Sequence, residues 1–382
     1  MRIAHFLQGR CNADSANGVE KTIYYLSRAQ AALGHDVSVF SLTGKPLLPI
    51  AGVEVKGYVP RWQPFAIPVQ LIADLRAWRP ALVHLHSAYV PPNASLGSAL
   101  RRHGIPYVVT PNGVLASALL RRRPHLKLPY KYLFELPTLN RASFVHAVGD
   151  EEEIRKYGVT APIVTAPNGF DVASIPRDLS TDLIERCWPE ARGRRIVVFV
   201  GRLDVEQKGL DTLLLGFRQA VRRSPMALVL AGPDWKGGRH RLEQMTRDLG
   251  IEPHVRFWGP AFGKEKFDLL ASADVFAYTS RWEGLPFAVV EALATGTPCL
   301  VTAVADPVGL VSRSETGMVV ELDEGHIASG ICRLAGMDRS TLRELGARAR
   351  PLVERELAWT TIAEKLHAAY TSYCVCTSRP AA

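Results

Sequence analysis

The feature that most limits how this chain can fold is a regular alternation of short β-branched runs with amphipathic stretches, and this alternation occurs twice. In the first series, runs rich in Val, Ile and Leu predict strands at residues 3–7, 37–41, 82–86, 107–110 and 144–148. Amphipathic stretches predict helices at residues 19–33, 68–78, 91–103, 128–141 and 151–157. Strands that alternate with helices form right-handed βαβ units, and such units build a parallel sheet.

A second series of the same kind follows a polar segment that Pro and Gly interrupt. Its predicted strands lie at residues 196–200, 227–231, 255–258, 275–278 and 299–302, and its predicted helices lie at 210–223, 239–249, 264–272 and 286–295. With 382 residues, the chain exceeds the roughly 250–300 residues at which a single hydrophobic core stops growing. We therefore expect an α/β protein of two Rossmann-like domains that face a cleft.

These patterns also set the expected domain boundaries. The first domain covers residues 1–172, a linker covers 173–193, and the second domain covers 194–355. A helix and tail follow at 356–382, and we expect this helix to cross back to the first domain. Ligands of doubly wound sheets bind at the carboxyl ends of the strands, so the expected site is the cleft between the two domains.

The positive charge is concentrated in the first domain. Residues 1–172 hold 19 of the 46 Lys and Arg residues and 11 of the 37 Asp and Glu residues, a net charge of +8 out of +9 for the chain. Within this half, residues 119–134 mix cations with large apolar and aromatic side chains. The pattern predicts an anionic partner, either a membrane surface or a diphosphate-linked acceptor; a solvated helix face is the alternative. No nucleic-acid-binding motif is present, so nucleic acid is not an expected partner.

The cysteines and the apolar runs indicate in which cellular compartment the protein is expected. The six cysteines lie far apart except for Cys374 and Cys376, a pattern that favours reduced thiols. No apolar run reaches the ~18–20 residues of a membrane span, and the N-terminal run lacks the small-residue cleavage site of a signal peptide. We expect a cytoplasmic protein, attached peripherally to the inner face of the membrane if the basic stretch contacts lipid.

Three common nucleotide-binding and hydrolase motifs are absent from the sequence. There is no G-x-G-x-x-G after a predicted strand, no G-x-x-x-x-G-K-[ST] and no G-x-S-x-G. These absences count against a dinucleotide dehydrogenase, a P-loop NTPase and an α/β-hydrolase.

The segment from Ser280 to Pro298 carries two carboxylates eight residues apart, Glu283 and Glu291. A predicted strand ends just before it and a predicted helix begins within it. At about 1.5 Å per helical residue, the carboxylates would lie roughly 12 Å apart, similar to the span from the hexose to the ribose of a nucleotide sugar. The helix N-terminus would attract the diphosphate between them. The alternative is a chance pair, although Glu291 among apolar neighbours needs a polar partner.

A second segment places two cations beyond the predicted strand 196–200. Arg202 follows this strand at its carboxyl end, and Lys208 lies in the turn before the next helix. Fixed cations at such a place can hold a diphosphate and stabilise the charge that develops as it leaves. Asp204 and Glu206 in the same turn are a weaker candidate for a metal pair, and neither a metal nor another cofactor is expected.

Three candidate features belong to the first half. Gly18 precedes a helix, and its small-residue loop allows a phosphate to approach the helix N-terminus, although such turns often contain Gly. His86 ends a predicted strand, so its imidazole either contacts a ligand in the cleft or satisfies backbone groups inside the fold. Trp62 and Phe65, in a Pro-rich loop, either line an acceptor site or pack.

Together these segments resemble the retaining GT-B glycosyltransferases of group four. The resemblance covers almost the whole chain and rests on motifs that occur in the family's order: Asn17-Gly18-Val19-Glu20, Val83-His84-Leu85-His86, Thr110-Pro111-Asn112-Gly113, Pro167-Asn168-Gly169-Phe170-Asp171, Gly201-Arg202-Leu203 with Lys208-Gly209-Leu210-Asp211, and Glu283 through Glu291. It implies a GT-B fold, and retention of the anomeric configuration without a required metal.

The resemblance also implies roles for individual residues. Arg202 and Lys208 would bind the diphosphate of the donor, Glu291 would bind its ribose, and Glu283 would lie near the donor sugar. The leaving phosphate would help to deprotonate the acceptor on the same face of the sugar. The expected substrate-binding residues are Gly18, His86, Asn112, Gly284, Leu285 and Glu291, and the expected catalytic residues are Arg202, Lys208 and Glu283.

Two positions depart from the family's pattern. Many relatives have His where this chain has Asn112, and that His would contact the donor sugar near the reacting carbon. Asn donates and accepts hydrogen bonds but cannot carry a proton, so the role of this position in catalysis stays open. Asn17 stands where relatives often have a second Gly, and Asn tolerates a left-handed backbone.

The sequence therefore predicts a retaining hexosyltransferase of polysaccharide or glycoconjugate assembly. Its donor would be a nucleotide sugar of the UDP or GDP type, and its acceptor a glycan or a lipid-diphosphate-linked sugar. Two alternatives stay open. One is a nucleotide-sugar epimerase or phosphorylase of the same fold, and the other is an inactive sugar-nucleotide-binding subunit, which Asn112 keeps in consideration.

Overall fold

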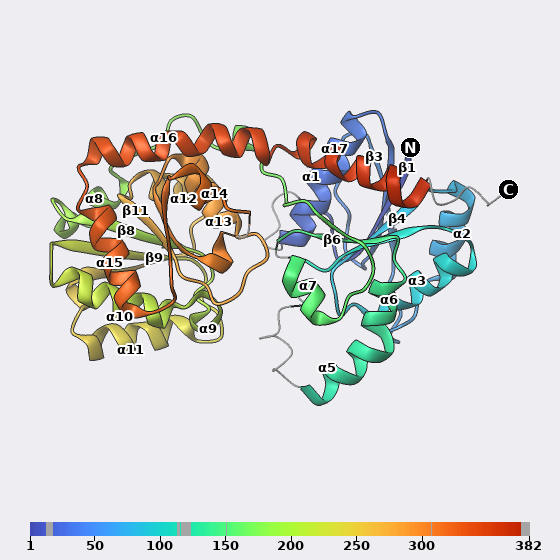
Figure 1. Ribbon diagram of the computed structural model, residues 1–382, viewed down its shortest axis with the longest axis horizontal. Helices are drawn as coiled ribbons and strands as arrows, with labels where there is room; N and C mark the ends of the chain where they lie inside the picture. Colours follow the sequence, from blue (N-terminus) through green and yellow to red (C-terminus); the bar gives the residue numbers. More distant parts are fainter. Residues whose placement is uncertain (13–17, 113–114, 116–123, 150, 307, 376–382) are drawn as a thin grey trace. The chain divides into compact units, whose positions relative to one another are not determined.

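The computed structural model describes residues 1–12, 18–112, 115, 124–149, 151–306 and 308–375 (Figure 1). The chain divides into two compact units. The first consists of Met1–Gly169 with Ala358–Ala382, and the second consists of Phe170–Leu357. Each unit contains its own sheet with helices packed on it, and hydrogen-bonded strands within both sheets are parallel.

The sheet of the first unit has the strand order β3-β2-β1-β4-β5-β6-β7, so the order reverses between β1 and β4. Its strands are β1 (Arg2–Gln8), β2 (Asp36–Leu42), β3 (Val53–Tyr58), β4 (Leu82–His86), β5 (Tyr107–Thr110), β6 (Phe144–Ala147) and β7 (Ile163–Thr165). Its described α-helices are α1 (Gly18–Ala32), α2 (Val69–Trp78), α3 (Pro91–Arg102), α5 (Pro124–Tyr130), α6 (Leu136–Asn140), α7 (Glu151–Tyr157) and the C-terminal α17 (Trp359–Tyr370).

The sheet of the second unit has the strand order β10-β9-β8-β11-β12-β13. Its strands are β8 (Arg195–Val200), β9 (Met226–Ala231), β10 (Val255–Gly259), β11 (Val275–Tyr278), β12 (Cys299–Thr302) and β13 (Gly317–Val320). Its described α-helices are α8 (Leu183–Cys187), α9 (Val205–Lys208), α10 (Leu210–Val221), α11 (Gly238–Leu249), α12 (Gly263–Ala271), α13 (Phe287–Thr295), α14 (Leu310–Ser314), α15 (Glu324–Ala335) and α16 (Arg339–Glu356).

The predicted fold class of two α/β domains with parallel sheets is confirmed. The expected placement of the C-terminal helix with the first domain is also confirmed, because α17 belongs to the first unit and packs on α1 (Figure 1). Leu366 and Tyr370 of this helix are fully buried in a core cluster with Leu26 of α1 and Phe144 of β6. This packing gives the first unit a helix that the chain supplies only after it has passed through the second.

The sequence patterns missed the outer strands β3, β7 and β13. Val53–Tyr58 contains Glu54 and Lys56 and is mostly half-exposed or exposed, so it lacks the apolar run by which the central strands were identified. β7 and β13 are only three and four residues long. Outer strands have one hydrogen-bonded neighbour, and short strands leave too few positions for a periodic pattern.

Two other segments differ from expectation. The helix predicted at 128–141 is divided into α5, a π-helical turn at Lys131–Glu135 and α6. Pro129 and Pro137 each remove a backbone donor, so an uninterrupted α-helical ladder cannot run through this segment. Residues 173–193, expected as a linker, contain α8, and Ile184 and Trp188 are buried in the core of the second unit.

Candidate functional site

The turn that carries Lys208 is fixed against the end of β11. Gly209 has a φ of +60°, and a Cβ at this position would lie 2.1 Å from the carbonyl oxygen of Thr279. Only Gly permits this approach. The Thr279 hydroxyl in turn donates to the carbonyl oxygens of Lys208 and Gly209, at 3.2 Å each. The backbone of the Lys208 turn is therefore attached to the carboxyl end of a central strand.

Lys208 and Glu283 form a buried ion pair at this edge of the sheet. The side chains are 7% and 8% exposed, and Nζ of Lys208 donates to Oε1 of Glu283. Nζ also donates to the Tyr278 hydroxyl at 2.6 Å, and the Ser280 hydroxyl donates to Oε1 of Glu283 at 2.7 Å. An ammonium group has three N–H donors, so one more remains for a ligand. The structure thus brings two of the predicted catalytic side chains into direct contact.

Tyr278 was not identified from the sequence. Its ring stacks on Phe199 with centroids 5.4 Å apart, and it ends the fully buried strand β11. Burial and the neighbouring Glu283 carboxylate raise the pKa of Tyr278 well above its usual value, so the hydroxyl stays protonated. In the sequence, an apolar run that ends in Tyr does not distinguish a tyrosine that binds Lys208 from a tyrosine that only packs in the core.

Arg202 is exposed and lies near the same turn. Its guanidinium carbon is 4.5 Å from the centroid of the Trp235 ring, and its Nη2 donates to Gln207 at 3.4 Å. Stacking on an aromatic ring orients a guanidinium group while its N–H donors stay available at the ring's edge. Trp235, which follows β9, is thus a second residue of the candidate site, after Tyr278, that the sequence did not reveal.

The acidic residues of this turn have structural partners. Asp204 is the N-cap of α9, where its carboxylate accepts from the backbone N–H of Gln207 at 3.1 Å. Asp211 accepts two hydrogen bonds from Arg281, at 2.9 and 3.0 Å, which tie the turn before α13 to the start of α10. The helix cap gives Asp204 a structural role, and the bidentate pair with Arg281 gives Asp211 one.

Glu291 lies in a separate ion pair. Its Oε1 is 2.5 Å from Nζ of Lys266 on α12, and the two side chains are 13% and 18% exposed. α13 begins at Phe287, after the N-cap Pro286. The spacing of about 1.5 Å per residue therefore applies only to the second half of the interval from Glu283 to Glu291. Gly284 and Leu285 lie in the non-helical turn between the two carboxylates and are half-buried.

The predicted residues of the first unit have different environments. Gly18 is exposed and is the first residue of α1, while the preceding loop residues 13–17, Asn17 among them, lie outside the described structure. Asn112 is half-buried with a φ of +55°, and its Nδ2 donates to the Thr110 carbonyl oxygen at 3.3 Å. Gly113 also lies outside the described residues.

His86 is 1% exposed, and its Nε2 lies 3.0 Å from Nδ1 of His5. The imidazole is therefore buried and bonded to another side chain, while its Nδ1 has no hydrogen-bond partner. The structure shows no hydrogen bond of this ring to backbone groups among the described residues, so the substrate-binding role of His86 stays a prediction. Among the described residues, His5, His84 and His86 offer ligand atoms within 4.8 Å of one another. The rings of His84 and His86 are stacked at 4.4 Å with an interplanar angle of 24°. Because ring-nitrogen lone pairs lie in the ring planes, these two do not converge on a common ion, and we place no metal there.

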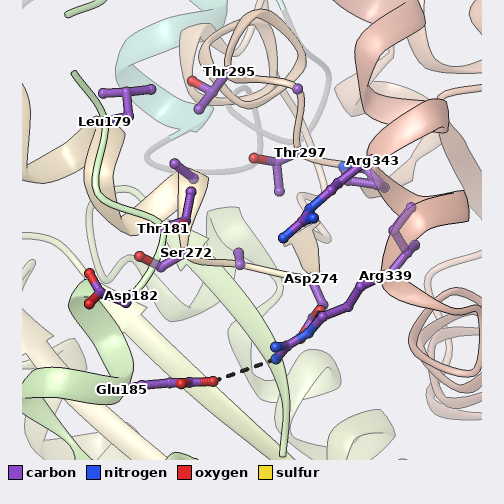
Figure 2. Close-up of a pocket in the computed structure, with 15 residues that line it drawn as sticks. Leu179, Thr181, Asp182, Glu185, Ser272, Asp274, Thr295, Thr297, Arg339 and Arg343 are labelled. Atoms are coloured by element: carbon purple, nitrogen blue, oxygen red, sulfur yellow. Dashed lines mark hydrogen bonds and ion pairs between the residues drawn. The ribbon is translucent and has the colours of Figure 1, made fainter. Parts of the chain in front are cut away.

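A pocket of about 470 Å³ lies elsewhere in the second unit (Figure 2). Asp274 and Pro298, immediately before β11 and β12, line it, so it adjoins the amino ends of the strands. Arg339 crosses it to pair with Glu185 at 3.5 Å and with Asp274 at 3.2 Å (Figure 2). Lys208 and Glu283 are at the opposite, carboxyl edge of this sheet, so the pocket is not part of the candidate site.

The fold defines the class of protein. Over 98% of this chain, it is similar to sucrose-phosphate synthase from Thermosynechococcus elongatus, with a TM-score of 0.74, 21% identity and 99% of that chain covered. Over 97% of this chain, it is similar to the Anabaena protein HepE in complex with UDP and glucose, with a TM-score of 0.73, 20% identity and 100% of that chain covered. The two parallel-sheet units thus have the GT-B fold.

The family follows from two sequence models. The model described as Glycosyltransferase Family 4 matches residues 16–174, and the model described as Glycosyl transferases group 1 matches residues 194–336. One match lies in each part of the chain, and together they cover most of it. The chain belongs to the glycosyltransferase family that these two models describe, as the motifs in the sequence predicted.

Among curated proteins, the chain is 30% identical over 221 residues to the GDP-mannose-dependent alpha-(1-6)-phosphatidylinositol monomannoside mannosyltransferase of Mycobacterium tuberculosis. That match covers 55% of this chain and 56% of the relative. The chain spans about half the length of the curated relatives it matches. No helix in the described part of the chain is long and apolar enough to cross a membrane.

Proposed function

We propose that this protein is a retaining glycosyltransferase that moves a sugar from a nucleotide-sugar donor to a glycan or lipid-linked acceptor. The observation that carries the proposal is the buried pair of Lys208 and Glu283 at the carboxyl edge of the second sheet. An enclosed ammonium with an unused donor suits a diphosphate, and an adjacent carboxylate suits sugar hydroxyls. Family membership supports the same assignment.

Each site residue has a distinct role in this proposal. Lys208 and Arg202 hold the diphosphate and stabilise the charge that it gains on leaving. Glu283 accepts from donor-sugar hydroxyls, with the backbone of Gly284 and Leu285 beside it. Glu291 accepts from the ribose diol. In the first unit, Gly18 and Asn112 are the proposed substrate-binding residues, and His86 acts through its buried contacts.

The proposed reaction replaces one bond of the anomeric carbon by another. The bond to the diphosphate oxygen breaks, and the bond to the acceptor oxygen forms on the same face of the sugar. The acceptor hydroxyl transfers its proton to a leaving diphosphate oxygen, so no enzymic base is required. A solved structure of the same fold contains UDP, and a relative is named as dependent on GDP-mannose, so the donor screen must include both bases.

The products of the reaction test the proposal. Purified protein is incubated with UDP- and GDP-sugars and a panel of glycan and lipid-diphosphate acceptors, and NMR identifies the new glycosidic bond. We expect one donor class to give a product with the anomeric configuration of the donor. A product of inverted configuration would refute the retaining assignment. A requirement for free phosphate would indicate a phosphorylase, and donor binding without any product would indicate an inactive binding subunit.

We further propose that the first unit attaches to an anionic membrane surface, in line with a lipid-linked acceptor. Two segments, 59–69 and 126–134, expose large apolar side chains: Val59, Trp62, Phe65, Val69, Leu126, Leu128, Tyr132, Leu133 and Phe134. The segments adjoin, because the rings of Phe65 and Phe134 are 4.6 Å apart. Exposed aromatic and aliphatic groups beside cations are typical of surfaces that enter the headgroup region.

Vesicle sedimentation checks this attachment. The protein is expected to bind vesicles with phosphatidylglycerol and not vesicles of phosphatidylcholine alone. Replacement of Trp62 and Leu133 by Ser should weaken binding by about tenfold or more, because the variant lacks two large apolar side chains whose burial in the membrane favours binding. Val319→Ser, an exposed site on the second unit, is the matched control and should leave binding unchanged. Equal recovery of all three proteins with the vesicles would contradict the proposal.

A further inference from the structure

A chain of buried polar side chains runs through the core of the first unit, and the proposed reaction uses none of it directly. In hydrogen-bonded order its members are His146, Thr110, His84, Tyr370, Gln30, His5 and His86, which we call the histidine chain. Each of them is at most 2% exposed. The histidine chain connects strands β1, β4, β5 and β6 to the helices α1 and α17.

All four imidazoles of the histidine chain are neutral at pH 7. Burial lowers the pKa of His5 and of His146 to about 4. Burial and the neighbouring imidazoles lower the pKa of His84 and His86 well below the usual value. A neutral imidazole carries one proton, so one nitrogen of each ring donates and the other accepts.

The position of every proton follows from one end of the histidine chain. Nε2 of His146 lies 2.8 Å from the carbonyl oxygen of Ala166, which can only accept, so Nε2 carries the proton. Nδ1 of His146 must then accept from the Thr110 hydroxyl, at 2.8 Å. That hydroxyl has donated its only proton, so it accepts from Nε2 of His84, at 2.5 Å.

The same reasoning assigns the protons in the rest of the histidine chain, from His84 to His86. Nδ1 of His84 accepts from the Tyr370 hydroxyl at 2.7 Å, so this hydroxyl accepts from Nε2 of Gln30, at 3.4 Å. Oε1 of Gln30 accepts from Nε2 of His5 at 2.7 Å. Nδ1 of His5 then accepts from Nε2 of His86, at 3.0 Å. Each hydrogen bond is thus donated in the direction from His86 towards His146. All four histidines carry their proton on Nε2.

The histidine chain is joined to two left-handed turns at the carboxyl ends of the strands. Thr110 ends β5, and Asn112 follows it with a φ of +55°. His86 ends β4, and Ser87 and Tyr89 follow with φ values of +71° and +56°. The N–H of Ser87 donates to the Thr110 carbonyl oxygen at 2.8 Å, which ties the two turns together. Non-glycine residues keep such conformations only where the surroundings determine them.

We propose that Tyr370 is a positioning residue for the transfer step, which acts through His84 and Thr110 to fix Asn112. This role rests on the proposed function, in which Asn112 is a substrate-binding residue of the first unit. A buried polar network holds one geometry where its members are paired. Every ring nitrogen of the histidine chain has a partner except Nδ1 of His86, which is its last member. Tyr370 is the member that α17 contributes, and its hydroxyl is the single link between His84 and Gln30.

The proton positions can be measured without any substrate. Long-range ¹H–¹⁵N correlation spectra of protein labelled in histidine are expected to show His5, His84, His86 and His146 as neutral Nε2–H tautomers at pH 7. Tyr370→Phe keeps the ring and removes only the hydroxyl, so the signals of His84 should shift in that variant. An Nδ1–H tautomer at His84, or no shift in Tyr370→Phe, would overturn the role of Tyr370.

Steady-state kinetics test the positioning itself. Tyr370→Phe is expected to lower kcat by about tenfold, because small misplacements of reacting groups are costly, and to leave the donor affinity unchanged. Thr110→Val, which breaks the next link of the histidine chain, should reproduce this loss if Tyr370→Phe folds poorly. Tyr58→Phe is the matched control, since it removes a tyrosine hydroxyl bonded to Asp74 at 2.6 Å on the edge strand β3.

A double-mutant cycle with Asn112→Ala separates positioning from a general loss of structure. If Tyr370 acts through Asn112, adding Tyr370→Phe to Asn112→Ala causes no further loss of kcat. A double variant in which the two losses multiply would overturn the proposal while leaving the proposed function intact. A wild-type protein that binds donor but transfers no sugar would instead contradict the proposed function, and the positioning role with it.

Discussion

Replacement of Lys208 by Met is expected to reduce kcat by about 10²–10³-fold, the usual effect of removing one preorganised group that stabilises transition-state charge. The ammonium is held by Tyr278 and Glu283 and directs its remaining donor to the leaving diphosphate in the proposed mechanism. The KM for the donor should change much less than kcat, because the charge on the diphosphate grows as the glycosidic bond breaks. Single-turnover measurements with saturating donor would separate the effect on the transfer step from the effect on donor binding.

The stability of the Lys208→Met variant needs its own control. Removal of one partner from a buried ion pair typically costs about 3–5 kcal/mol, because the remaining charge stays buried. The double variant Lys208→Met with Glu283→Gln removes both charges and should recover much of that stability without recovering kcat. Lys264→Met, which breaks the more exposed pair with Asp268 in the same unit, should leave kcat unchanged. Recovery of turnover in the double variant would show that Lys208 acts through stability alone.

Replacement of Glu291 by Gln is expected to weaken nucleotide binding by about 10- to 100-fold, since a hydrogen bond to a charged group contributes about 1.5–3 kcal/mol. The ribose diol would lose its carboxylate acceptor, while the shape of the side chain is kept. Equilibrium titration with UDP and GDP measures the loss. At saturating donor, kcat should change little, because the ribose lies away from the reacting carbon.

The pair of Glu291 with Lys266 supplies a matched comparison. If the carboxylate serves only to hold α13 to α12, Glu291→Gln and Lys266→Met break the same contact and should have the same effect on stability and on nucleotide binding. If Glu291 binds the ribose, only Glu291→Gln weakens nucleotide binding. Equal nucleotide affinities in the two variants would remove Glu291 from the site.

The central part of the fold could be predicted because its strands are apolar on both faces. β4, β5, β11 and β12 coincide with the predicted ranges, and each is fully buried. The outer strand β3 alternates apolar with charged residues along a half-exposed edge, so the run that identifies a central strand is missing. The divided helix before β6 could not be foreseen from periodicity, which continues across Pro129 and Pro137.

The sequence could suggest single residues of the candidate site, but it could not show which side chains from different segments lie in contact there. Arg202, Lys208 and Glu283 could be chosen as candidates because each follows a predicted buried strand within a motif. Their partners could not, because Tyr278 and Trp235 become partners only through the sheet that aligns their strands. The histidine chain was missed for the same reason, since its members come from six separate elements and only His84 and His86 are neighbours in sequence.

The most direct test of the central claim, that this protein binds a nucleotide sugar at the Lys208–Glu283 edge, is a thermal-shift measurement with UDP, GDP, ADP and their sugars. Each ligand is tested with and without magnesium, on the wild type and on Glu291→Gln. A ligand that binds only the folded state raises Tm. We expect a rise in Tm with one nucleotide family, independent of magnesium and smaller in Glu291→Gln. A folded wild-type protein whose Tm no nucleotide raises would contradict the account.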